Sequence, residues 1–162
     1  MDRLVKKAQR GDAEAFIALI EENKMALRRV ALGYLGNDED VADAIQDTIL
    51  DAFEHIRELR REEYFKTWLV RILINNCTRM YRKNKNRVSL EEVRDMGVCD
   101  RQTAEMEFLQ LLCSLPEDSR TIFQLYYGER FTTREIAEVL EMKENTVKSR
   151  LHRGKEQLRA EV

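Results

Sequence analysis

The sequence predicts an all-α protein made of two small helical domains, residues 1–87 and 108–162, joined by a flexible linker over residues 88–107. Three observations support this fold class. One proline and six glycines among 162 residues leave few helix breakers. Apolar residues recur at steps of three and four on both sides of the linker, which is the period of a helix with one buried face. Between them the periodicity is weak and charges of both signs alternate.

Composition narrows the classes of function. A net charge of −2 excludes a protein that is basic over its whole surface, yet the charges are segregated into local patches. Cys77, Cys99 and Cys113 form no CxxC motif, and we expect reduced thiols. No metal-ligand spacing is present, so no metal or other cofactor is predicted. Without a secretory signal or an apolar run of roughly 20 residues, we expect a cytoplasmic location.

The first domain is predicted to hold two amphipathic helices before its most distinctive segment. Asp12 is a suitable N-cap for a helix that Gly36-Asn37 ends. Its buried face would consist of Phe16, Leu19, Ile20, Leu27, Val30, Ala31 and Tyr34. A second helix is expected over residues 39–59. Its predicted core stripe is Val41, Ile45, Ile49, Ala52, Phe53 and Ile56.

The other face of the 39–59 helix is acidic. Residues 37–56 hold seven acidic side chains and no Lys or Arg. Five of them recur at steps of three or four, namely Asp40, Asp43, Asp47, Asp51 and Glu54. Like charges four residues apart destabilise a helix by roughly 0.2–0.5 kcal/mol per pair. Two interpretations stay open: a face that is solvated or neutralised by the basic helix that follows, and a docking surface for a basic partner protein.

Residues 64–87 combine cations with aromatic rings. From Lys66 to Arg87 there are seven Lys or Arg and no Asp or Glu. This combination suits single-stranded nucleic acid. Helical spacing directs Leu69, Leu73, Cys77 and Tyr81 toward the core. It groups four candidate nucleic-acid contacts on another face: Trp68, Asn75, Arg79 and Arg82. For Trp68 alone a core position is the favoured alternative, whereas the charge-biased face as a whole indicates function.

The second domain is predicted to contain three helices. Pro116 suits the first turn of the first helix, and Gly128 ends it. Its apolar face would be formed by Ile122, Phe123 and Tyr126 or Tyr127. Thr132 and Glu135 make the T-x-x-E capping box of the second helix. After a turn at residues 141–143, the last helix would bury Val147, Leu151, Gly154 and Leu158.

The last two helices match a helix-turn-helix pattern, because a short turn joins them and the small Ala137 lies where they cross. Residues 143–159 hold six Lys or Arg against two Glu. The exposed positions of the last helix are Asn145, Lys148, Ser149, His152 and Arg153. Capping, spacing and charge together favour binding of duplex DNA over a purely structural helical hairpin.

With these motifs in order, the chain resembles the extracytoplasmic-function (ECF, group 4) sigma factors of the sigma-70 family, which are small promoter-specificity subunits of bacterial RNA polymerase. RGDAEAF resembles the family's opening, DEDVADAIQDTILDAF its core-binding helix, and FKTWLVRILINNCTRMYRK its −10 segment. SLPEDSRTIFQLYY and FTTREIAEVLEMKENTVKSRLHRGKEQL resemble its −35 domain. The five motifs occur in the family's order and cover nearly the whole chain.

The resemblance implies a non-catalytic initiation factor that binds core RNA polymerase and promoter DNA. Residues 1–87 would be sigma region 2, a helical bundle, and residues 108–162 would be the helix-turn-helix domain of sigma region 4. Asp43, Gln46 and Asp47 match positions that dock on the clamp coiled coil of the largest polymerase subunit. The family is commonly held inactive by a cognate anti-sigma factor, often one anchored in the membrane.

The same resemblance implies roles in promoter recognition. Asn75 matches a position that lines a pocket for a flipped −10 base, and Trp68, Arg79 and Arg82 lie near it in the sequence. In the last helix, base-reading positions of the −35 element are matched by Lys148, Ser149 and His152. Arg153 matches a phosphate contact. Three residues depart from the usual pattern: Lys143 at the N-cap, Glu141 where the turn often has Gly, and His152 itself.

Two other classes of function compete with this interpretation. A free-standing helix-turn-helix regulator would bind duplex DNA without polymerase, but it leaves the segregated charges of residues 37–87 unexplained. A nucleic-acid-processing enzyme would need paired carboxylates, metal ligands or an activated nucleophile, and the acidic residues here lie on a regular helix without ligand partners.

Overall fold

A computed structural model of the chain describes residues 2–87, 111–112 and 114–161, and every regular element in these ranges is a helix. The N-terminal group comprises α1 (Asp2–Gln9), α2 (Ala13–Tyr34), α3 (Asp38–His55), η1 (Ile56–Glu58), η2 (Glu62–Tyr64) and α4 (Phe65–Arg87). The C-terminal group comprises α7 (Glu117–Phe123), the π-helical η4 (Gln124–Gly128), α8 (Thr133–Leu140) and α9 (Glu144–Glu161). The predicted all-α class with two helical groups is confirmed, and the predicted linker falls on residues outside the description.

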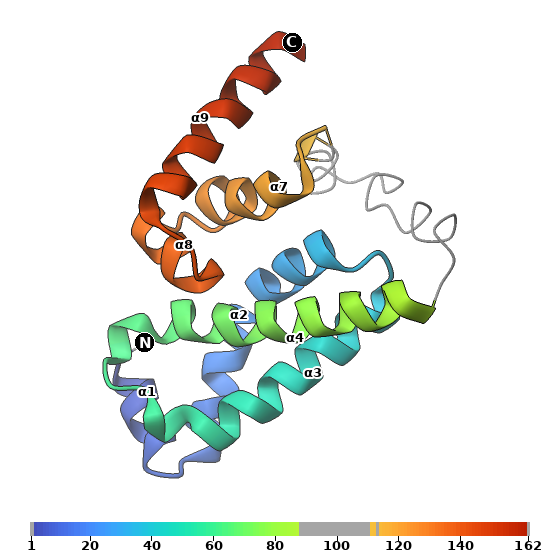
Figure 1. Cartoon of the computed structure of the whole chain (residues 1–162). Helices are drawn as coiled ribbons and strands as arrows, with labels where there is room; N and C mark the ends of the chain where they lie inside the picture. The colour runs from blue at the N-terminus through green and yellow to red at the C-terminus, as the bar shows by residue number, and fades with distance from the viewer. Residues whose placement is uncertain (1, 88–110, 113, 162) are drawn as a thin grey trace.

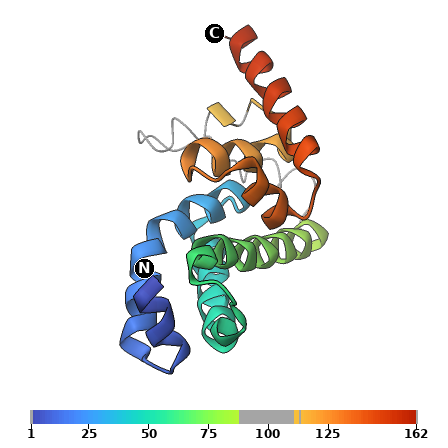
Figure 2. The same cartoon turned by 90° about the vertical axis from the view of Figure 1, so that its left-hand side faces the viewer.

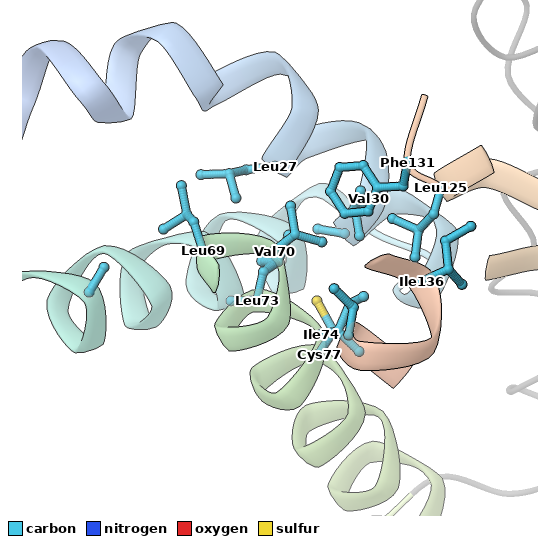
Figure 3. Packing of buried hydrophobic residues seen from close by; sticks show 14 of the residues in the cluster. Leu27, Val30, Leu69, Val70, Leu73, Ile74, Cys77, Leu125, Phe131 and Ile136 are labelled. Carbon is cyan, nitrogen blue, oxygen red and sulfur yellow. The ribbon is translucent and has the colours of Figure 1, made fainter. Parts of the chain in front are cut away.

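The two groups pack against each other along α4. Figure 1 shows α8 directly above α4, and Figure 2 shows the same contact from the side. Figure 3 shows Val70 and Ile74 of α4 among Leu125, Phe131 and Ile136 of the C-terminal group. All five side chains belong to one buried cluster that extends through both groups. The apolar core is therefore continuous from one half of the described chain to the other.

The first helix, α1, was not anticipated from the sequence. It is short and buries only Val5 and Ala8, so its periodic signal is weak. Gln9 fixes its end, because Nε2 donates to the Ile56 carbonyl at 2.9 Å and to the Leu59 carbonyl at 2.8 Å. Gly11 then turns the chain with φ of 99°, a conformation that favours glycine.

The second helix, α2, follows the prediction closely. Asp12 is the N-cap, and its side chain accepts a hydrogen bond from the Ala15 amide at 3.1 Å. The predicted apolar residues are buried apart from Tyr34, which is partly exposed. Asn23 adds a buried polar side chain that donates to the Leu19 carbonyl at 2.8 Å. The helix ends at Tyr34, two residues before the predicted Gly36-Asn37 stop signal, with Leu35 as its C-cap.

The buried face of α3 differs from the predicted core stripe. Phe53 is 57% exposed, and Ile45 and Ile49 are only partly buried. The buried positions are Val41, Ala44, Thr48 and Ala52. These mostly small side chains let α3 lie close to α4, and Thr48 accepts a hydrogen bond from Asn76 of α4 at 3.1 Å. Close packing of small residues thus outweighed the burial of large ones at this interface, and the prediction for Phe53 was wrong.

Helix α4 has the predicted core face. Leu69, Leu73 and Cys77 are fully buried, whereas Tyr81 is partly buried. Burial raises the pKa of the Cys77 thiol to about 12, so this thiol stays protonated at neutral pH. A protonated, buried thiol is a poor nucleophile, and Cys77 therefore serves packing. The other two cysteines lie outside the described residues.

The C-terminal group holds its last helix through a close contact with α7. Pro116 is the N-cap of α7, and the helix continues into η4, which ends at the predicted Gly128. In α9, Val147 and Leu151 are buried as predicted, and Leu158 is partly buried. Gly154 is also buried, where it faces the ring of Phe123.

We predict that Gly154→Ala destabilises the fold. A Cβ at this position would lie 2.6 Å from Cζ of Phe123 and closer still to Cε2, and Phe123 is 2% exposed. Overpacking costs about 1–3 kcal/mol, against a gain in helix propensity of about 1 kcal/mol. Chemical denaturation followed by circular dichroism should show a free energy of unfolding lowered by roughly 1 kcal/mol. Ser149→Ala, at an exposed site of α9, is the control, and an unchanged stability of Gly154→Ala would contradict the prediction.

Candidate nucleic-acid interface

Three of the four predicted contacts on α4 come together at one pocket. Asn75, Arg79 and Arg82 line a cavity of about 900 Å³ between α4 and the C-terminal group. Its opposite wall includes apolar and charged side chains from the end of α8, the following turn and α9. These are Val139, Leu140, Glu141, Met142 and Arg150. The cavity therefore combines an amide and guanidinium groups with an apolar wall, the side-chain types that hold bases and phosphates.

Trp68 does not join these three residues. Its ring is partly buried, packs against the common core and lies 5.9 Å from the ring of Phe65 with an interplanar angle of 42°. It is not among the residues that line the α4 pocket. The predicted grouping of four side chains is thus reduced to three, and the packing of Trp68 agrees with the alternative of a core position.

Asparagine side chains of α4 bind part of the acidic stripe. Asn76 Nδ2 donates to Asp51 Oδ2 at 3.1 Å, and its Oδ1 accepts a hydrogen bond from Arg79. Asn84 Nδ2 donates to Asp40 Oδ2 at 2.8 Å. The next helix therefore contacts the stripe through amides rather than cations, and these bonds do not neutralise it. Sequence reasoning missed both asparagines because an amide leaves no mark on a charge pattern.

The middle of the acidic stripe is available to a partner. Asp43, Gln46 and Asp47 are exposed, and neither aspartate forms an ion pair within the described part of the chain. The same helix also exposes Leu50 and Phe53, each to 57%. The rings of Phe53 and Phe16 form a T-shaped pair with centroids 5.3 Å apart. The exposed surface of α3 thus combines acidic and apolar side chains.

The helix-turn-helix geometry matches the sequence pattern. The capping box is present, since Thr132 accepts from the Glu135 amide at 3.1 Å and Glu135 accepts from the Thr132 amide at 3.1 Å. Glu141 ends α8 in the left-handed region, with φ of 54°, so a non-glycine residue adopts the turn conformation that glycine favours. A hydrogen bond of 2.9 Å from Thr133 to Glu144 links α8 to α9 and lowers the pKa of Glu144.

All five predicted contacts on α9 are exposed: Asn145, Lys148, Ser149, His152 and Arg153. Two of them lie next to acidic residues of the same helix. Lys148 Nζ is 3.5 Å from Glu144, and His152 Nε2 is 3.2 Å from Glu156. Exposed pairs of this kind contribute little to stability, so both side chains are available to another ligand.

A buried carboxylate joins the two helical groups, and no sequence pattern indicated it. Glu129, whose side chain is 1% exposed, accepts from Arg29 Nε at 2.7 Å and Nη2 at 3.1 Å. Lys66 Nζ of α4 lies 3.5 Å from the same carboxylate. In addition, Gln124 Nε2 donates to the Arg29 carbonyl. Residues a hundred positions apart leave no local signal, and only the fold brings them together.

Within the described residues, no helix has the length and apolar composition needed to cross a bilayer. The same part of the chain contains no cluster of three His, Cys, Asp or Glu side chains that could hold a metal ion.

Comparison with known families gives two matches on this chain. Residues 19–87 match the family model Sigma-70 region 2, and residues 105–158 match Sigma-70, region 4. The ECF RNA polymerase sigma factor SigW of Bacillus subtilis is 27% identical over 98% of this chain and 94% of its own length. The ECF RNA polymerase sigma factor SigM of Mycobacterium tuberculosis is 31% identical over 91% of this chain and 77% of its own.

Two solved structures are similar over most of the chain. CnrH, in complex with the cytosolic domain of CnrY, has a TM-score of 0.75 and 25% identity, covering 98% of this chain and 94% of CnrH. The sigma factor RpoE, in complex with the anti-sigma factor NepR from Bartonella quintana, has a TM-score of 0.72 and 22% identity. It covers 91% of this chain and 96% of the RpoE chain, and at that identity it supports the fold alone.

Proposed function

The chain belongs to the ECF RNA polymerase sigma factors of the sigma-70 family, and on this basis we propose how its two helical groups divide promoter recognition between them. Sigma factors are transcription initiation factors without enzymatic activity, so the chemistry resides in the polymerase. The observation that carries the proposal is the order of matches on one chain. A region 2 match is followed by a region 4 match whose last helix exposes a row of polar and basic side chains.

The surface of α3 docks on core polymerase. Asp43, Gln46 and Asp47 bind the clamp coiled coil of the largest subunit, which requires complementary basic side chains on that subunit. Their exposure and the lack of an intrachain ion pair at either aspartate within the described residues support this role. The partner supplies the cations that the acidic stripe lacks, and the like-charge repulsion along α3 becomes attraction in the complex.

The α4 face captures the melted −10 strand. Asn75 binds a flipped base, while Arg79 and Arg82 hold the adjoining phosphates. Flipping a base costs a few kcal/mol of unstacking energy, and stacking with pocket contacts offsets it by about 1–3 kcal/mol per base. Trp68 contributes by supporting the helix from its packed position rather than by stacking on a base. The shared pocket of the three polar residues supports this assignment.

Helix α9 enters the major groove of the −35 element. Lys148, Ser149 and His152 read base edges, Asn145 lies at the N-terminal end of the same exposed row, and Arg153 holds a phosphate. The division of the chain into residues 1–87, 88–107 and 108–162 follows from these roles. The exposure of all five side chains supports them.

An anti-sigma factor controls the protein in the cytoplasm. The support is that CnrH was solved in complex with the cytosolic domain of CnrY. A partner anchored in the membrane would hold this chain at the membrane until released.

The first test is transcription in vitro with core polymerase and genomic promoter templates. The proposal predicts promoter-specific transcripts only when this chain is added. A free-standing helix-turn-helix regulator is the competing function. It would instead bind duplex promoters without polymerase and leave core enzyme without a specific transcript.

We predict that Asn75→Ala weakens −10 discrimination and leaves core binding intact. Loss of one base contact of about 1–3 kcal/mol corresponds to roughly a fivefold or larger loss in preference for the correct base. Transcription from promoters with single −10 substitutions measures the preference. Asn76→Ala is the matched comparison, since Asn76 is buried and bonded to α3, and it should lower stability instead. Impaired core binding by Asn75→Ala would mean that the residue is structural.

We predict that reversing two charges, Asp43→Lys with Asp47→Lys, weakens core binding about tenfold or more. Each reversal places a like charge against the basic partner at a cost on the order of 1 kcal/mol. Fluorescence anisotropy with core polymerase measures the affinity. Glu21→Lys with Glu22→Lys makes the same change of charge at exposed sites of α2 and should have little effect. Equal affinities of both double variants would refute the docking role of α3.

A further inference from the structure

The C-terminal group presents a row of three carboxylates to the N-terminal group. Glu129 binds Arg29 and Lys66, as described above. Two further contacts lie next along α4. Glu135 Oε2 accepts from Thr67 Oγ1 at 2.9 Å, and Glu141 Oε1 accepts from Arg71 Nη2 at 2.7 Å. The row therefore follows the first two turns of α4, with α8 supplying the middle carboxylate and its C-cap the last.

The site at Glu129 has the geometry of an oxyanion site. Arg29 binds the carboxylate with two parallel N–H groups, the bidentate mode that arginine also uses for phosphate. Lys66 adds a second cation, 5.8 Å from the centroid of the Phe131 ring. The two cations keep side-chain exposures of 33% and 36%, while the carboxylate has 1%. If the C-terminal group withdrew, Glu129 would leave and both cations would stay on the N-terminal group.

The backbone around Glu129 is built to hold the side chain in place. Glu129 is the C-cap of η4, and its amide donates to the Gln124 carbonyl at 3.1 Å. The next residue, Arg130, has φ of 58°, which a non-glycine residue adopts only at a cost of order 1 kcal/mol or more. Gln124 of the same turn bonds the Arg29 backbone, so η4 is attached to α2 at two points.

The same packing borders the α4 face that we propose for the melted strand. The pocket of Asn75, Arg79 and Arg82 is closed on its far side by the end of α8 and the turn after it. Glu141 belongs both to that wall and to the carboxylate row. The C-terminal group thus engages the polar side chains at the start of α4, while the pocket further along the helix keeps a volume of about 900 Å³.

We propose that Arg29, Lys66, Thr67 and Arg71 form a phosphate-binding strip for single-stranded nucleic acid, and that Glu129, Glu135 and Glu141 occupy it in the free chain. The carboxylates take the positions of backbone phosphates, so the C-terminal group competes with the strand. The inference rests on the proposed function, because it extends the −10 site from the far end of α4 to its beginning and to α2.

The test measures polymerase-free binding of a labelled single-stranded DNA of mixed sequence by fluorescence anisotropy at low salt. Glu129→Gln with Glu141→Gln removes two carboxylates and keeps the side-chain shapes. We expect the double variant to bind the DNA at least tenfold more tightly than the wild type. Small-angle scattering of the same samples should show a larger radius of gyration. Glu138→Gln with Glu21→Gln, at exposed sites of α8 and α2, makes the same change in net charge outside the row and should bind like the wild type.

A second pair of variants identifies the strip itself. Adding Arg29→Gln and Lys66→Gln to the double variant should abolish the gain in affinity and make the binding less dependent on salt, by a slope of up to about two. If the double variant expands but binds DNA no more tightly, or if the gain survives the loss of both cations, the proposal is wrong. A gain equal to that of the control variant, Glu138→Gln with Glu21→Gln, would also overturn it.

Folding and function are separated by two further measurements. Circular dichroism checks that each variant is folded. If the double variant fails to fold, Glu141→Gln alone replaces it, because Glu141 is exposed and its ion pair with Arg71 lies at the surface. It should raise DNA affinity several-fold, and no rise would count against the proposal. Polymerase-dependent transcription by the wild type tests the proposed function independently. Wild-type transcription with no gain in any variant would reject the strip and leave the initiation role intact.

Discussion

Helix α4 is packed on two sides, and most of the architecture follows from that constraint. One side carries Leu69, Leu73 and Cys77 into the core of the N-terminal group. An adjoining side directs Val70 and Ile74 toward Phe131 and Ile136 of the C-terminal group, as Figure 3 shows. Apolar burial contributes roughly 25 cal/mol per Å², so both interfaces are stabilising. Asn75, Arg79 and Arg82 lie outside these two interfaces and line one pocket.

The segregation of charge also constrains the surroundings of α4. From Lys66 to Arg87, α4 has seven Lys or Arg and no Asp or Glu, so its cations cannot form ion pairs within the helix. The fold places acidic side chains beside it: Asp51 and Asp40 of α3 accept hydrogen bonds from its asparagines, and the buried Glu129 lies next to its first cation, Lys66. A buried carboxylate is destabilising unless it is paired. The contacts of Glu129 with both Arg29 and Lys66 meet that requirement.

Local chemistry accounts for what the sequence predicted well. The caps at Asp12 and Thr132 and the periodicity of α2, α4, α8 and α9 depend on residues within a few positions of one another. The family resemblance rests on similarly local motifs, and it identified the chain as a sigma factor before any coordinates. The features that the sequence did not predict depend instead on contacts between distant elements. The rotation of α3 that exposes Phe53 depends on how closely α4 approaches, and the Glu129 site depends on residues distant in the sequence. No window of sequence contains that information.

The left-handed conformation of Glu141 places one residue under two opposing demands. Its backbone, with φ of 54°, would be relaxed by glycine, since a left-handed non-glycine residue costs roughly 1–2 kcal/mol. Its side chain, however, is the one that reaches Arg71 on the other helical group. Glycine at this position would therefore lower the backbone strain of the turn, but it would remove the contact with Arg71 between the two groups. A substitution that stabilises this turn would therefore remove a contact between the two helical groups, and the melting temperature alone would not separate the two effects.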